Sequence, residues 1–262
     1  MDKWVILHAG SRFSMILGKV LGKSVYMVDI DTLVNETQVH VSLGAQDQHA
    51  WSVNGHIISN FCERILFQEV FYRFDKSLRH YERQDKMYVQ FCWQAYLLSL
   101  FSQTRLVLNP VTPQTLTVSQ YQFPRLLAIA ESKGLRVPRY EIGRKDKNGY
   151  LPVDSLWFHP YRKCTAPSIM NVSLDGAVWE IIRFVRYDAG FLVTWPALPG
   201  EVHEQLLQVC NDLGIYLGEA YFRVDIEWTF YGLCPQLQAS DVDDDVLTEI
   251  AHCIRDLGNG VL

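Results

Sequence analysis

The sequence lacks long apolar runs, an excess of positive charge and an export signal. The formal net charge is -5, so the chain has no general electrostatic attraction to nucleic acid or to an anionic membrane. No apolar run approaches the roughly 20 residues that a membrane-spanning helix needs. The opening MDKWVILHAGSRF has neither an extended apolar region nor a small-residue cleavage site. We therefore expect a cytoplasmic protein with no nucleic-acid or membrane partner.

Clustered metal ligands and phosphate-binding glycines are also missing. The six cysteines include no CxxC pair, and the eight histidines form no HxxxH or HxH pattern. Ligand spacing of that kind is the usual sign of a metal site, so none is predicted. Gly10, Gly18 and Gly22 complete neither a GxGxxG nor a Walker motif, which makes a phosphate loop near the N-terminus a weak hypothesis. The cysteines are expected to be free thiols.

The first 80 residues alternate between β-type runs and turns, which predicts an α/β lobe rich in strands. A short amphipathic helix or turn is expected at Met15–Gly22, and the pair Asn54-Gly55 indicates a tight turn between two strands. The expected strands are Trp4–His8, Ser24–Ile30, Val39–Leu43, Ala50–Ile58 and Leu66–Tyr72.

The stretch Met87–Ile142 is predicted to combine two helices with a short strand. Apolar residues recur at helical spacing from Val89 to Leu100. Arg105–Leu108 is a brief β-type run. Pro124 suits the first turn of the second helix, and Gly134 suits its left-handed end.

The C-terminal part predicts a hairpin and two helices. Alternating apolar residues flank Asp175-Gly176, a strong short-loop signal, so Ile169–Arg183 is predicted to be a β-hairpin. Glu201–Leu213 has the apolar spacing of a helix, and Gly214 suits its left-handed end. The acidic run Asp241–Asp245 lacks the glycine and the terminal glutamate of a calcium loop. It is more simply the cap of a helix at Asp245–Leu257, where carboxylates stabilise the N-terminus.

Four motifs occur in a characteristic order: a Trp-rich helix, an Asn-Pro strand end, a proline-led helix and a Gly-Φ-x-Val-Pro strand entry. They read here as Trp93–Leu98, Asn109-Pro110, Pro124 and Gly134–Pro138. This order resembles bacterial ATP-grasp ligases with a pre-ATP-grasp domain, including those that modify ribosomal peptides. The resemblance implies an α/β fold, with a pre-ATP-grasp lobe followed by a truncated ATP-grasp-like α+β lobe. It also implies that Asp29 and Arg73 line a cleft, although each is more simply a strand-end surface residue.

On this resemblance the chain divides into four parts. Residues 1–80 form the pre-ATP-grasp-like lobe, and residues 81–143 form a helix-strand-helix segment leading into the ATP-grasp core. Residues 144–167 are a linker that replaces the nucleotide-covering subdomain, since the family's V-x-K-P run is missing. Residues 168–262 form the C-terminal hairpin and helix lobe.

Several cations that grip phosphates in the resembled family are replaced. Phe123 stands where relatives usually carry a lysine before the helix-opening proline, and the arginine that opens the family's hairpin is absent. The remaining candidates for nucleotide or anion contacts are Lys163, Arg183, Arg186 and Arg223. ATP-dependent chemistry requires several cationic groups against the phosphates, so these candidates are sparse.

The metal ligands of the resembled family are replaced as well. The resembled family holds Mg²⁺ with an Asp on one strand of a hairpin and a Glu-x-Asn pair on the next, and the resemblance places Tyr221 at the Asp, Cys234 at the Glu and Gln236 at the Asn. Mg²⁺ requires oxygen ligands in near-octahedral geometry, and two anionic ligands are lost here. A shifted register would bring Asp225 or Glu227 near the first metal position, but no shift restores Glu-x-Asn.

These departures predict a pseudoenzyme that acts as a binding or scaffold subunit, in a peptide-modification or biosynthetic complex. We assign no catalytic residue and expect no cofactor or metal; a protein or peptide partner is expected, and a homo-oligomer also fits. One alternative is a reduced ATP-dependent carboxylate-amine (peptide) ligase whose rebuilt site uses ATP and Mg²⁺. A further alternative is a nucleotide or small-molecule sensor, which would bind nucleotide without turnover.

Overall fold

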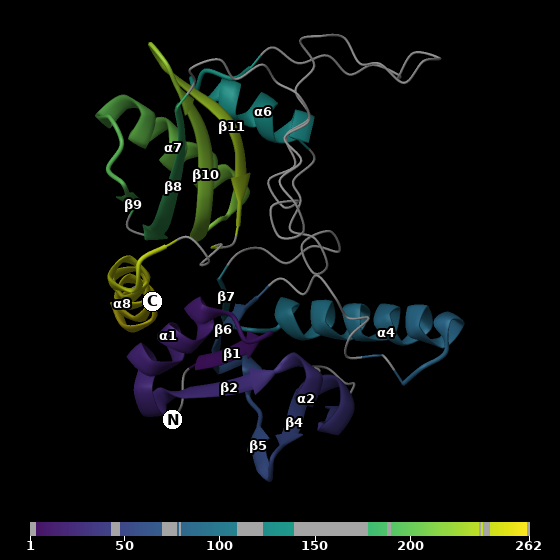
Figure 1. The fold of residues 1–262 in the computed structure, drawn as a ribbon. Coiled ribbons are helices and arrows are strands. Elements are labelled where there is room, and N and C mark those ends of the chain that lie inside the picture. Colours follow the sequence, from purple (N-terminus) through teal and green to yellow (C-terminus); the bar gives the residue numbers. More distant parts are fainter. Residues whose placement is uncertain are drawn as a thin grey trace, which may run out of the picture. The chain divides into compact units, whose positions relative to one another are not determined.

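The structure is a computed structural model that describes residues 4–42, 48–69, 78, 80–108, 123–138, 178–187, 190–235, 237 and 242–260. The chain divides into two compact units. The first comprises Met1–Ser119, Tyr187–Ala189 and Gln236–Leu262, and the second comprises Gln120–Arg186 and Gly190–Pro235. Figure 1 labels most of the helices and strands of both units.

The first unit contains a parallel sheet, an antiparallel sheet and their covering helices. Its elements are β1 (Trp4–His8), α1 (Arg12–Leu21), η1 (Gly22–Ser24), β2 (Val25–Asp29), α2 (Ile30–Glu36), β3 (Gln38–Ser42), β4 (Gln48–Val53), β5 (His56–Ile58), η2 (Phe61–Glu63), β6 (Ile65–Gln68), α4 (Arg83–Ser102), β7 (Leu106–Val107) and α8 (Asp244–Gly260). The parallel sheet has the order β2-β1-β6-β7. From Trp4 to Leu7 the central strand β1 is at most 2% exposed, as expected for a parallel strand covered on both faces.

Helices α1 and α8 pack together within this unit. The Arg12 guanidinium lies 2.5 Å from the Asp244 carboxylate, which joins the start of α1 to the start of α8. Gly258 sits so close to the Trp4 ring that a side chain there would overlap the indole. Helix α8, which lies in the range 168–262 that we predicted as the C-terminal lobe, therefore packs in the first unit.

The antiparallel sheet has the order β3-β4-β5 and confirms the predicted strands in this region. Asn54 and Gly55 have positive φ angles of 50° and 79°, as the predicted tight turn requires. The residues of this sheet that face α4 include Trp51, which is wholly buried and whose indole N–H donates to the Tyr96 hydroxyl at 2.5 Å.

Among the described residues, no helix, α4 included, has the length and apolar character needed to cross a membrane.

Helix α2 was not predicted from the sequence. We read Asp29 as the end of a strand, and it does end β2, but its carboxylate also accepts the backbone N–H groups of Asp31 and Thr32. An aspartate in this position caps a helix, which is why the chain turns directly from β2 into α2. The structure thus gives Asp29 a capping role, and the cleft role that the resemblance implied stays a prediction.

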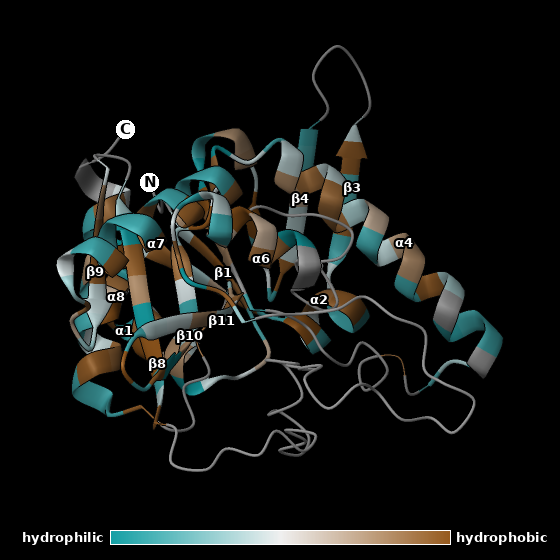
Figure 2. Cartoon of the chain, turned by 90° about the horizontal axis from the view of Figure 1, so that it is seen from above, coloured by the Kyte–Doolittle hydropathy of each residue, from teal (hydrophilic) through white to brown (hydrophobic). Residues whose placement is uncertain are grey.

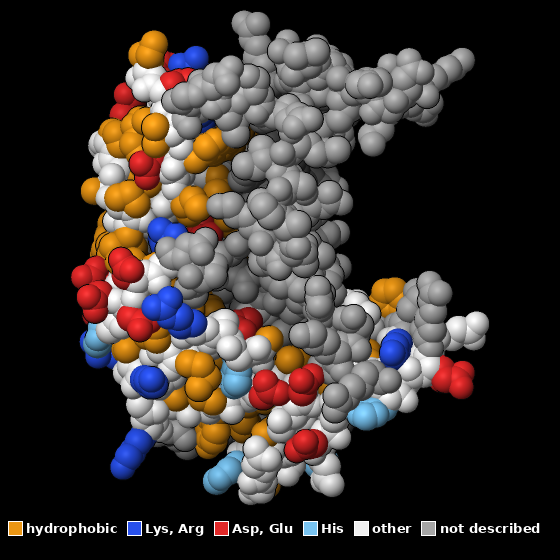
Figure 3. Space-filling view, in the orientation of Figure 1, with side chains coloured by type: hydrophobic (Ala, Val, Ile, Leu, Met, Phe, Trp, Pro, Cys, Tyr) orange, Lys and Arg blue, Asp and Glu red, His pale blue; other side chains and the backbone are white. Residues whose placement is uncertain are grey.

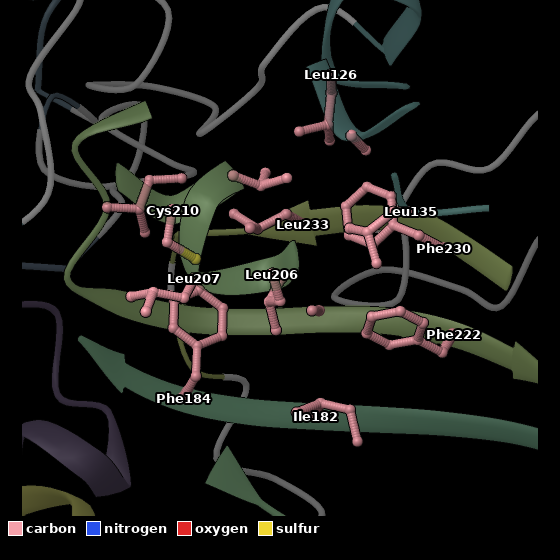
Figure 4. Close-up of a cluster of buried hydrophobic side chains, with 14 of the residues drawn as sticks. Leu126, Leu135, Ile182, Phe184, Leu206, Leu207, Cys210, Phe222, Phe230 and Leu233 are labelled. Atoms are coloured by element: carbon pink, nitrogen blue, oxygen red, sulfur yellow. The ribbon is translucent and has the colours of Figure 1, made fainter. Parts of the chain in front are cut away.

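The second unit is a four-stranded sheet with two helices on one face. Its elements are α6 (Phe123–Ser132), β8 (Val178–Tyr187), β9 (Phe191–Trp195), α7 (Gly200–Leu213), β10 (Leu217–Val224) and β11 (Trp228–Cys234). The strand order is β11-β10-β8-β9. Alternate residues of the strands meet leucines of α6 and α7 in one core, as Figure 4 shows for Ile182, Phe184 and Phe222. The predicted left-handed ends of α6 and α7 are confirmed, with φ angles of 89° at Gly134 and 65° at Gly214.

The predicted hairpin Ile169–Arg183 is only partly visible in this sheet. Its first strand and the turn Asp175-Gly176 lie outside the described residues. Its second strand, β8, runs on to Tyr187 and lies between β10 and β9. Strand β9, with the sequence FLVTW, was not predicted from the sequence.

Candidate functional site

Four of the predicted site residues, Arg183, Tyr221, Arg223 and Cys234, are in the strands of the second unit's sheet, on the face opposite the helices. Directly opposed residues of antiparallel strands share a face, and successive residues alternate between faces. Arg183 of β8 is opposite Glu219 of β10, and Glu219 is opposite Cys234 of β11. Ile182 and Phe184 point the other way, into the helix-covered core. The three residues therefore form a row across the sheet.

The two positions that the family pattern assigns to anionic metal ligands come together on this face. Tyr221 is 3% exposed and Cys234 is wholly buried, and with Ile181 they form a small apolar cluster. The Tyr221 hydroxyl donates a hydrogen bond of 2.9 Å to Glu219 Oε2. Mg²⁺ selects several oxygen ligands, preferably charged, and a thiol is a poor substitute. These residues do not fit a magnesium ion.

Glu219 is the buried acidic residue of this face, and it was not among the residues predicted from the sequence. It is 1% exposed, and Arg183 Nε lies 3.5 Å from its Oε1. A carboxylate buried this deeply needs a cation and hydrogen-bond donors to remain charged. Its charge is compensated by Arg183 and Tyr221 of the same sheet. The sequence did contain a signal for Glu219. It lies two residues before Tyr221 in the strand LGEAYF, and residues at that spacing share one face of a sheet.

Arg223 and the two alternative acids lie toward the turn between β10 and β11. Arg223 Nη2 is 3.4 Å from Asp225 Oδ2, while its buried Nε has no hydrogen-bond partner among the described residues. The backbone N–H of Glu227 donates to Asp225 and lowers the pKa of that carboxyl, and the Arg223 guanidinium lowers it further. Glu227 forms an ion pair with Arg136. Both acids are exposed, and each already has a cation.

Arg186 is not brought together with Arg183 and Arg223. Its guanidinium donates to the Ile215 carbonyl at 2.8 Å and to the Asn211 side-chain oxygen at 2.9 Å. The group also lies 4.1 Å from the centre of the Tyr216 ring, and the residue is 8% exposed. This placement favours a packing role for Arg186. The candidates Lys163 and Gln236 lie outside the described residues.

The carboxyl end of the parallel sheet in the first unit is the other place where this fold class holds ligands. Glu69, which follows β6 and is 3% exposed, accepts the Ala9 N–H at 2.7 Å and the hydroxyl of Ser11. Ser11 is the N-cap of α1, and a helix N-terminus attracts anions. Here the anion at the N-terminus of α1 is the Glu69 carboxylate of the chain itself. The arrangement gives no support to the weak hypothesis of a phosphate loop near Gly10.

The described part of the candidate site combines cationic and acidic side chains, because Arg183 lies beside Glu219 and Arg223 beside Asp225. Its face carries two guanidinium groups, from Arg183 and Arg223, and a single buried carboxylate, from Glu219. Within the described ranges, no three His, Cys, Asp or Glu side chains are arranged to hold a metal ion.

Solved structures of the same fold match almost the whole chain. The macrocyclase MdnC of Microcystis aeruginosa MRC, bound to its precursor peptide MdnA, has a TM-score of 0.65 at 12% identity, with 95% of this chain and 98% of that chain covered. A Chryseobacterium gregarium RiPP-associated ATP-grasp ligase, in complex with ADP and a leader and core peptide, has a TM-score of 0.65 at 10% identity, covering 98% and 97%. The ATP-grasp ligase PsnB, with a precursor peptide and AMPPNP, has a TM-score of 0.59 at 14% identity, covering 99% of each chain.

No protein-family model matches the sequence, and no curated protein matches it either. The structural likeness nevertheless extends over both units. The predicted fold class is confirmed. The chain therefore has the α/β fold of the ATP-grasp ligases that carry a pre-ATP-grasp lobe.

Proposed function

We propose that this protein is an ATP-grasp pseudoenzyme that binds a peptide or protein partner in a cytoplasmic peptide-modification complex. The observation that carries the proposal is the state of the metal positions. Tyr221 and Cys234 replace two anionic ligands, and the nearby carboxylate of Glu219 is held by Arg183 and Tyr221. Without anionic oxygen ligands, Mg-ATP loses the charge neutralisation that phosphoryl transfer requires.

A peptide is the partner class that the fold favours. The similar structures of MdnC, the Chryseobacterium gregarium ligase and PsnB each contain a precursor, leader or core peptide. A chain that keeps this fold and loses the metal ligands can still present a peptide-binding surface, because binding and phosphoryl transfer use different groups. We expect the protein to hold a short peptide, either alone or beside a catalytic partner.

The test for nucleotide is thermal unfolding of the full chain with Mg-ATP, with Mg-ADP and with EDTA. A ligand that binds only the folded state adds about 2.7 kcal/mol at one hundred times its Kd. For a chain of this size that raises the midpoint by about 2–4 °C per kcal/mol. We expect no shift at millimolar nucleotide. A rise that EDTA abolishes would overturn the pseudoenzyme proposal and show that metal binding persists.

The test for peptide is selection from a displayed library of random short peptides against the immobilised full chain. We expect a shared motif among the enriched peptides, and a synthetic peptide with that motif should bind in calorimetry. A scrambled peptide of the same composition is the control. Failure to enrich any motif would count against the peptide part of the proposal, while leaving the nucleotide result to stand by itself.

A reduced ligase or a nucleotide sensor is the second candidate, and one observation favours it. Arg183 and Arg223 lie on one face of the sheet, and the buried Nε of Arg223 has no hydrogen-bond partner within the described ranges. Such a face can accept a phosphate without a metal. Metal-independent ATP binding without ADP release would identify a sensor; ADP release dependent on a peptide carboxylate and amine would identify a ligase. Arg223→Gln should weaken either.

A further inference from the structure

Two ion pairs of the second unit involve the face of its sheet opposite the helices. Arg183 Nε lies 3.5 Å from Glu219 Oε1, and Arg223 Nη2 lies 3.4 Å from Asp225 Oδ2. The side chains of the first pair are 16% and 2% exposed, and those of the second pair are 29% and 46% exposed. In Figure 2 strands β8 and β10, which carry the first pair, contain hydrophilic as well as hydrophobic residues. Of the two pairs, the first is the buried one.

Stability alone does not explain the burial of the Arg183–Glu219 pair. A buried ion pair is weak evidence for stability, because apolar residues of similar volume often stabilise a core at least as well. On the visible described part of the second unit, Figure 3 shows acidic and basic side chains scattered among hydrophobic ones at the surface. A pair that is buried inside the sheet instead points to a role for charge at that place.

Glu219 lies beside both positions that the resemblance assigns to metal-binding carboxylates. Cys234 of β11 is directly opposite Glu219, and Tyr221 follows two residues later on the same face of β10. These two residues stand where the resembled family has a Glu and an Asp. The chain thus keeps a buried acidic residue next to both positions, although neither position carries one.

Each carboxylate oxygen of Glu219 has a described partner. Oε1 faces the Arg183 guanidinium, and Oε2 accepts the hydrogen bond of 2.9 Å from the Tyr221 hydroxyl. A carboxylate at position 221 would accept hydrogen bonds and attract cations, whereas the phenol donates. Tyr221 also packs against Ile181 and Cys234 in the small apolar cluster. A cation and a hydrogen-bond donor of the chain itself therefore face the charge of Glu219.

The Arg183 guanidinium and a divalent metal ion exclude each other at this face. A dication about 5 Å from a guanidinium loses more than about tenfold in affinity even with the dielectric constant of water, and more in a protein interior. Arg183 also neutralises the carboxylate that would attract such an ion. Together Arg183 and Glu219 carry no net charge, so the pair disfavours a metal ion without leaving a charge of its own.

We propose that the Arg183 guanidinium is a built-in cation that takes the place of a metal ion on this face. The inference rests on the proposed function and adds its regulation. Because side chains of the chain itself balance the charge, neither Mg²⁺ nor nucleotide is needed to hold β8, β10 and β11 in their arrangement. The binding of a peptide or protein partner is then independent of both.

Binding of Mn²⁺ without nucleotide tests the built-in cation, with free Mn²⁺ measured by electron paramagnetic resonance in solutions of the full chain. We expect Arg183→Gln to bind Mn²⁺ more than about tenfold more tightly than the native chain, because the positive charge beside Glu219 is removed. Arg183→Lys is the matched control, since it keeps the charge and should show no gain. Adding Glu219→Gln to Arg183→Gln should abolish the gain, because the carboxylate ligand is then removed.

Thermal unfolding of the same samples shows whether the ion binds the folded chain. At about ten times its Kd for Arg183→Gln, Mn²⁺ should raise the midpoint of that variant by about 3–6 °C. Arg223→Gln, which removes the guanidinium beside Asp225, is the second control and should show no rise. The refolding yield with and without Mn²⁺ covers the case in which Arg183→Gln folds only with the ion. An equal response of the native chain, Arg183→Lys and Arg183→Gln, or no response of any of them, would overturn the proposal.

A failure of the built-in cation is distinguishable from a failure of the proposed function. Metal-dependent binding of Mg-ATP by the native chain would overturn the pseudoenzyme proposal, and that measurement uses no variant. A response to Mn²⁺ that does not depend on Arg183 would overturn the built-in cation alone, while the native chain still fails to bind Mg-ATP.

Discussion

Replacing Arg183 by methionine should destabilise the second unit, because the buried carboxylate of Glu219 would lose the guanidinium that lies beside it. Glu219 is 1% exposed, and Arg183 Nε lies 3.5 Å from it. Removing one partner of a buried ion pair costs about 3–5 kcal/mol. Tyr221 still donates its 2.9 Å hydrogen bond, so we expect a loss near the lower limit, about 3 kcal/mol.

A second change should recover part of that loss. With Glu219→Gln added, the buried charge disappears and the Tyr221 hydroxyl keeps an acceptor, so the double variant should lose only about 1–2 kcal/mol. Arg223→Met is the matched control, since it removes a guanidinium of the same face whose partner, Asp225, is exposed. We expect it to cost about 1 kcal/mol or less.

Urea unfolding gives the total free energy, and hydrogen exchange measured by mass spectrometry locates the loss in β8 and β10. A loss of stability alone does not show whether Arg183 also binds a ligand. Nucleotide and phosphate binding of Arg183→Met are therefore measured on the same samples. If Arg183→Met unfolds like the native protein and instead loses an anion that the native protein binds, Arg183 is a ligand cation. The reasoning from the buried pair would then be refuted.

Tyr96→Phe removes the acceptor of the wholly buried Trp51 indole N–H, 2.5 Å away, and should cost about 1–3 kcal/mol in urea unfolding. Tyr88→Phe, on the same helix but 72% exposed, should change the value by about 0.5 kcal/mol or less, and equal losses would contradict the argument. The pKa of Asp225 is lowered on folding, mainly by the Glu227 N–H, so its contribution to stability is complete above the pKa of an unfolded aspartate and is lost as the pH falls through the folded pKa. Asp225→Asn should therefore flatten the acid side of the melting temperature against pH; an unchanged acid side would show that the hydrogen bond does not stabilise the fold.

Much of the fold could be predicted because its signals are local. A β-type run indicated β1, alternation indicated the antiparallel strands, and the glycines at 134 and 214 end their helices with positive φ as expected. Helix α2 was missed because Asp29 serves two elements at once: it ends a strand and caps the helix that follows directly. A sequence interpretation that expects a turn between β2 and the next element therefore misses α2.

The candidate site was less accessible to sequence reasoning. The family pattern directed attention to Tyr221 and Cys234, and the structure does bring these two together. Glu219 is not at a metal-ligand position of the pattern, and its pairing with Arg183 depends on the register between β8 and β10, which no local signal reveals. Arg186 lies only three residues from Arg183, yet the alternation of the strand places it away from the row.

The packing of α8 against α1, with Gly258 beside the Trp4 ring, has a consequence for synthesis on the ribosome. The first unit begins with β1, but it cannot close over Trp4 until α8 has emerged. At about 5–20 residues per second, the roughly 250 intervening residues take about 13–50 s to translate. During that interval the second unit, which needs no part of α8, can fold first, while the apolar surface of the nascent β1–α1 layer requires a chaperone or a partner to keep it from aggregating.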